Sequence, residues 1–86
     1  MDVAVWDTYV DRSDGRTMHS DILVKTGASF ETVRRYGAEY LADKDVVEET
    51  LTTDECEFCH VEAASEETTQ AIDEDGYAIV ELNNCG

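Results

Sequence analysis

The sequence predicts an α+β fold, in which one small sheet that begins with a β-hairpin is joined by two main helices. Residues 3–10, 16–24 and 77–82 are rich in β-branched and aromatic types, which favour strands. Residues 29–43 instead repeat apolar side chains at helical spacing. Because 86 residues without a visible repeat or boundary correspond to one domain, we expect residues 1–86 to share a single thin core.

The first two strand segments are separated by the turn sequence Ser-Asp-Gly at residues 13–15. Gly15 can supply the positive φ that tight hairpin turns require, so an antiparallel hairpin is predicted. The register of this hairpin is not fixed by the sequence.

The first predicted helix runs from residue 29 to residue 43. Ser29 is a candidate N-cap, although Thr32 stands where a full capping box has Glu. Gly37 in the helix interior costs about 1 kcal/mol relative to Ala, and therefore predicts close packing against the sheet at that point.

The second half of the chain is predicted to continue as a short helical turn, a strand, a helix and a final strand. After a solvated connection, these elements span Asp54–Cys59, His60–Ala64, Ser65–Asp75 and residues 77–82. Gly76 is expected to end the longer helix. The predicted order is thus β-β-α-(short α)-β-α-β.

The charge balance is strongly acidic: 21 Asp and Glu against 6 Lys and Arg give a formal net charge of −15. These charges are spread along the chain, and they repel over about 10 Å at 0.1 M salt but only about 3 Å at 1 M. The composition is typical of halophilic cytoplasmic proteins, and we expect folding to weaken as KCl is lowered.

The same acidity argues against nucleic-acid and anionic-membrane partners, which need clustered Lys and Arg. The first residues carry neither the basic region of a signal peptide nor a long apolar stretch, so we expect a cytoplasmic protein. A core this thin would suit a homodimer, whereas any other protein partner is unknown.

The tightest group of potential metal ligands is Cys56, Cys59 and His60. On a helical turn, spacings of three and four would place these three side chains on one face. If the last strand brings Cys85 back to them, a four-ligand zinc site results, with His19 as the alternative fourth ligand.

Other interpretations of these cysteines remain open. Cys56 and Cys59 can be small buried hydrophobes beside Phe58. They can also form a redox dithiol, although neighbouring Glu residues raise thiol pKa values and count against it. The Cys-x-x-Cys-His spelling is also that of c-type haem attachment, which needs an export signal that is not visible here.

His19 is the second candidate position, on the face of its strand opposite Met18. It could form an acid–base pair with Asp7, stand across from Tyr9 or Thr8, or make only a structural hydrogen bond. Among so many carboxylates no acid–base pair can be singled out, so no catalytic residue is nominated.

The whole chain resembles a family of small bacterial and archaeal proteins known as domain of unknown function 2024. The Cys-x-Phe-Cys-His element is its most specific part. The resemblance implies a compact α+β fold and carries no activity with it. The residues that support it are Val3 to Tyr9, Met18-His19, Asp21-Ile22, Tyr36-Gly37, Glu39 to Leu41, Leu51-Thr52, Glu55-Cys56, Phe58 to His60, Gly76-Tyr77 and Cys85.

Two hypotheses about function follow from these patterns. The first is a non-enzymatic binding or assembly module, stabilised by zinc through the Cys-x-x-Cys-His cluster. The alternative is a cytoplasmic dithiol redox or metal-handling protein that uses Cys56 and Cys59. Enzymatic activity is the less favoured interpretation, and the sequence names no substrate.

Overall fold

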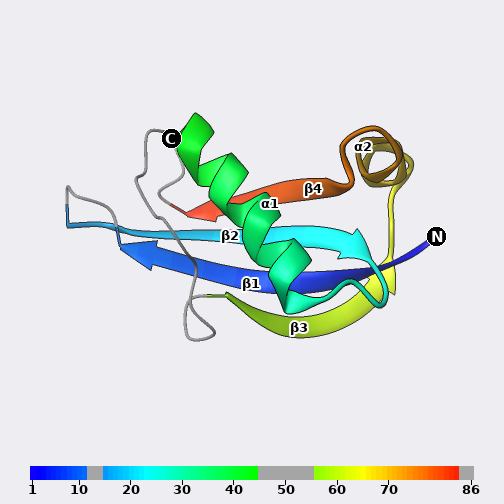
Figure 1. Cartoon of the computed structure of the whole chain (residues 1–86), viewed down its shortest axis with the longest axis horizontal. Coiled ribbons are helices and arrows are strands. Elements are labelled where there is room, and N and C mark those ends of the chain that lie inside the picture. The colour runs from blue at the N-terminus through cyan, green and yellow to red at the C-terminus, as the bar shows by residue number, and fades with distance from the viewer. Residues whose placement is uncertain (12–14, 45–55, 84–86) are drawn as a thin grey trace.

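A computed structural model describes residues 1–11, 15–44 and 56–83 of the chain. These residues form one antiparallel sheet of four strands, in the order β3-β1-β2-β4, and two helices (Figure 1). The elements are β1 (Asp2–Asp11), β2 (Thr17–Lys25), α1 (Phe30–Asp43), β3 (Cys56–Ala63), α2 (Glu66–Asp75) and β4 (Tyr77–Asn83). The predicted α+β class, with its initial hairpin and two main helices, is confirmed.

The hairpin of β1 and β2 forms the centre of the sheet, and its register pairs Tyr9 with His19 and Asp7 with Asp21. Gly15 has φ +85°, as the turn prediction requires, while residues 12–14 lie outside the described part of the chain. β3 pairs with β1, and β4 pairs with β2, so the two strands from the second half of the chain form the edges.

Helix α1 crosses one face of the sheet obliquely (Figure 1). Ser29 is its N-cap and accepts a hydrogen bond from the backbone N–H of Thr32, as predicted. Gly37 is buried on the inner side of this helix. The buried residues of this layer are Ala4, Val10, Met18, Ile22, Val24, Val33, Tyr40, Leu41 and Cys56.

The C-terminal end of α1 is fastened to β4 by polar contacts. The Tyr40 hydroxyl donates a hydrogen bond of 2.7 Å to Glu81, and the Lys44 ammonium lies 2.9 Å from the same carboxylate. These hydrogen bonds lower the pKa of Glu81 below its usual value, because they favour its charged form.

Helix α2 covers only one end of the opposite sheet face. Its Ile72 packs with Val3, Val5 and Leu23, which alternate with the side chains under α1. Ser65 caps its first turn, and Gly76 ends it in the left-handed conformation at φ +90°, as predicted. In the described part of the chain, neither helix is long and apolar enough to cross a membrane.

One predicted element is wrong. The helical turn expected over Asp54–Cys59 does not extend to Cys56, because β3 begins there and runs to Ala63. Residues 54 and 55 lie outside the described part. Cys56 is buried opposite Thr8 of β1, so pairing with a strand distant in sequence outweighs the weak local helix signal.

Candidate metal centre

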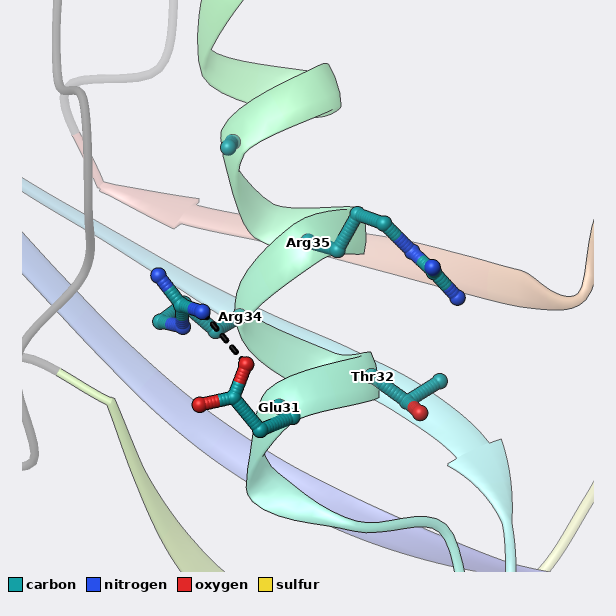
Figure 2. Close-up of a pocket in the computed structure, with 5 residues that line it drawn as sticks. Glu31, Thr32, Arg34 and Arg35 are labelled. Carbon is teal, nitrogen blue, oxygen red and sulfur yellow. Dashed lines mark hydrogen bonds and ion pairs between the residues drawn. The ribbon is translucent and has the colours of Figure 1, made fainter.

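Two surface hollows have linings without His or Cys side chains. The first, of about 270 Å³, lies on the outer surface of α1 and is formed by successive turns of this one helix (Figure 2). Arg34 turns toward Glu31 at 2.5 Å, whereas Arg35 points to the other side of the helix (Figure 2). The second, of about 350 Å³, runs between α2 and β4. Neither hollow has a lining that suggests a catalytic or metal-binding site.

The concentration of chemically active side chains lies elsewhere, on the sheet face that α2 covers at one end only. Asp7 of β1, together with His19 and Asp21 of β2, offers ligand atoms that all lie within 4.8 Å of one another. Nε2 of His19 is 3.9 Å from Oδ1 of Asp7 and 3.9 Å from Oδ1 of Asp21. Among the described residues, this is the group of three or more His, Cys, Asp or Glu side chains whose potential ligand atoms lie this close together.

The hairpin register creates this group. Asp7 and Asp21 are directly opposite each other, and His19 is two residues before Asp21 on the same face. The Tyr9 ring stacks on the His19 ring with centroids 4.1 Å apart and an angle of 11° between the planes. This stacking holds the imidazole beside the two carboxylates, since Tyr9 is its cross-strand partner.

The environment of Asp21 disfavours its charged form. Burial and the neighbouring Asp7 together raise its pKa to about 7, because burial disfavours the charged form and Asp7 both hydrogen-bonds the protonated form and repels the charged one. Its Oδ1 atom is buried and has no hydrogen-bond partner in the described structure. The nearby His60 acts in the opposite direction and lowers this pKa, while Glu62 raises it.

In protein kept metal-free with a chelator, Asp21→Asn is expected to raise stability by about 1–2 kcal/mol above pH 8, less than full linkage because the side chain is partly exposed. The folded pKa is about 7, against an ordinary value of 3.8. Folded protein therefore retains a proton that unfolded protein has lost, and stability from this group falls as pH rises across that window. The asparagine variant should show a flatter pH profile in urea unfolding, whereas Asp11→Asn, on the neighbouring strand β1, should match wild type.

Cys59 and His60 lie beside this group, on β3. Nδ1 of His60 is 3.2 Å from the Cys59 sulfur, and its Nε2 is 3.4 Å from Glu62. The pKa of the Cys59 thiol is raised by desolvation and by the negative charge of Asp7 and Asp21. Two of the predicted ligands are thus neighbours of the cluster rather than members of it.

Cys56 has a different environment. Its side chain is 1% exposed, in the core under α1, and the hydroxyl of Thr8 donates to its sulfur at 3.8 Å. Cys56, Cys59 and His60 were expected to share one face because a helical turn was predicted there. These residues lie in a strand instead, so that argument for their convergence is wrong. Cys85 lies outside the described residues, and the four-ligand zinc site remains an untested prediction.

The sequence pointed to Asp7 only as a possible acid–base partner of His19, and it named neither Asp7 nor Asp21 as a metal ligand. The available signal was their position on the non-core face of a predicted hairpin that also carries His19. Many carboxylates share such positions in this chain, and only the register shows which ones meet.

Comparison with known proteins gives a family and a solved relative. The family model described as "Domain of unknown function (DUF2024)" matches residues 1–82. The NMR structure of protein NE1680 from Nitrosomonas europaea is similar over 100% of both chains, with 32% sequence identity and a TM-score of 0.84. Among curated proteins, no significant match is found.

Proposed function

Because the chain belongs to the DUF2024 family, whose description assigns no function, we propose a role from its geometry: a small non-enzymatic module that binds one divalent metal ion. The proposed ligands are Asp7, His19 and Asp21. The observation that supports it is the convergence of their three ligand atoms within 4.8 Å.

The geometry and chemistry of these donors suit a first-row divalent ion. Ligand atoms about 2.0–2.2 Å from a tetrahedral ion are separated by roughly 3.4 Å. The two 3.9 Å distances from His19 would therefore need to shorten by only about half an ångström, within the reach of small side-chain rotations. Imidazole and carboxylate together suit Zn²⁺, Mn²⁺ and Co²⁺.

The electrostatics of the site favour a cation. Asp7 and Asp21 repel each other when both are charged, and this repulsion adds to the effect of burial in raising the pKa of Asp21. A divalent ion would remove this repulsion and give the buried Oδ1 of Asp21 a partner. The formal charge of −15 would also draw cations toward the protein.

A binding role is favoured over catalysis because of where the site lies. Its ligands stand on a strand pair rather than in either of the two described hollows. Enzyme sites usually enclose their substrate in a cleft that excludes water. Asp7 and His19 are instead 32% and 25% exposed, which suits ion capture from solution.

The test is Zn²⁺ titration of chelator-treated protein by isothermal calorimetry in about 1 M KCl, which screens non-specific attraction to the acidic surface. We expect one ion per chain. Asp21→Asn, which removes a charge, and His19→Phe, which preserves the ring stack on Tyr9, should each weaken binding more than about tenfold.

Asp11→Asn is the matched control, because it removes one charge from the same strand as Asp7, and its hydrogen bond from Thr17 can be kept by Asn. It should bind Zn²⁺ as wild type does. The proposal is contradicted if wild type binds no stoichiometric ion, or if the control loses as much affinity as the ligand variants.

A dithiol role for Cys56 and Cys59 receives less support. Residues three apart on a strand are separated by roughly 10 Å, beyond the 4.4–6.8 Å between Cα atoms that a disulfide tolerates. One thiol is buried and the other exposed.

A further inference from the structure

On the basis of the proposed metal site, we infer that Cys59 is an additional ligand of the same ion, which makes the site selective for thiophilic cations such as Zn²⁺ and Co²⁺ over Mg²⁺ and Ca²⁺. Carboxylate and imidazole alone discriminate weakly among divalent ions, whereas a thiolate strongly disfavours the hard ions. Asp7, His19 and Asp21 alone do not determine which divalent ion is bound, and the added thiolate would select the thiophilic ones.

The backbone of β3 carries an irregularity at this cysteine. In the register with β1, Val5 pairs with His60 and the next residue, Trp6, pairs with Phe58. Cys59 is therefore the extra residue of a β-bulge, opposite no single partner. Bulges redirect side chains and are common beside functional sites.

The Cys59 thiol lies close enough to the proposed ligands to interact with their charges. Desolvation and the carboxylates of Asp7 and Asp21 all raise the pKa of this thiol. Its sulfur is outside the group that converges within 4.8 Å, but this thiol is exposed and one χ1 rotation moves a sulfur by about 3 Å. Phe58, the preceding residue, instead packs edge-on against Trp6 at 5.8 Å, on the face under α1.

In its present rotamer the thiol contacts the next residue of its own strand. Nε2 of His60 lies 3.4 Å from Glu62, and Nδ1 of the same ring lies 3.2 Å from the Cys59 sulfur. Rotation of the thiol toward the ion would exchange the contact with His60 for the bond to the metal. On binding, the thiol would lose its proton to solvent as the sulfur–metal bond forms, so one proton is released for each ion bound through sulfur.

Cobalt substitution tests the inference. Co²⁺ bound through thiolate should produce an intense ultraviolet sulfur-to-metal charge-transfer band, besides the weak visible bands that any bound Co²⁺ gives. We expect this band in wild type and its loss in Cys59→Ser. The same variant should bind Zn²⁺ at least about tenfold more weakly but bind Mg²⁺ unchanged.

Cys56→Ala and Cys85→Ser are the matched controls, with folding checked by circular dichroism, and both should keep the band. If wild type binds Co²⁺ without the band, or if the band survives in Cys59→Ser, the inference is overturned while the metal-binding function stands. If wild type binds neither Co²⁺ nor Zn²⁺, the proposed function fails as well.

Discussion

Lowering KCl from about 1 M to about 0.01 M is expected to lower the midpoint of thermal unfolding by roughly 10–20 °C. The physical reason is repulsion among the 21 carboxylates, which 6 Lys and Arg cannot offset. Two unit charges 8 Å apart in water repel by roughly 0.5 kcal/mol, and about six such pairs sum to roughly 3 kcal/mol. At 1 M salt the screening length of about 3 Å removes most of this energy.

The salt effect can be assigned to particular charges. Asp73 and Asp75 lie exposed in the last turn of α2, where the helix dipole disfavours negative charge and no basic residue compensates. The double substitution Asp73→Asn with Asp75→Asn should raise the low-salt midpoint and reduce its dependence on KCl. At 1 M KCl the variant and wild type should melt at similar temperatures.

Thermal melts followed by circular dichroism over this KCl series provide the measurement. Sucrose at matched water activity is the control, since it stabilises compact states without screening charge. A midpoint that does not change with KCl would rule out the salt-adapted interpretation of the composition. Equal rescue by sucrose would show that excluded solute, rather than charge, is responsible.

The sequence predicted those elements whose signals are local. Ser29 and Gly76 mark helix ends through hydrogen-bonding and conformational preferences that act within one turn, and both predictions are confirmed. The prediction of a helical turn at Cys56 was wrong because the conformation of this segment comes from pairing with β1, about fifty residues earlier in the chain. Contacts of such long range leave almost no local signal.

The candidate site was only partly predictable for a related reason. His19 was placed correctly on the face opposite Met18, because alternation along a strand is a local rule. Its neighbours depend on which residue of β1 it meets, and a shift of register would replace Asp7 by a different side chain. The position of Cys59 depends in addition on a β-bulge, which cannot be predicted from the composition of β3.

The acidic surface and the proposed site place different demands on cations. A diffuse field of carboxylates attracts any cation and is satisfied by K⁺ at high concentration. The imidazole of His19, held against Tyr9 at 4.1 Å, is a ligand that K⁺ does not favour but Zn²⁺ does. Molar KCl should therefore suppress binding to the general surface far more than binding at these three residues.

Gly76→Ala is expected to destabilise the fold by about 2–3 kcal/mol, roughly 10–20 °C in melting midpoint. Two causes add at this position. Gly76 adopts φ +90°, which L-residues disfavour by about 1 kcal/mol. An added Cβ would also lie 2.5 Å from the Tyr36 hydroxyl oxygen, and this ring cannot easily move because it stacks on Tyr77 at 4.6 Å.

Gly27 provides a matched control for the backbone contribution, because it has φ +89° and an added Cβ would meet nothing within 4 Å. Gly27→Ala should therefore lose only about 1 kcal/mol in urea unfolding. In a Tyr36→Leu background, the penalty of Gly76→Ala should fall to that of Gly27→Ala, since the obstructing hydroxyl is gone. If the two alanine variants are equally destabilised and Tyr36→Leu changes neither, close packing between α1 and the start of β4 does not determine this turn.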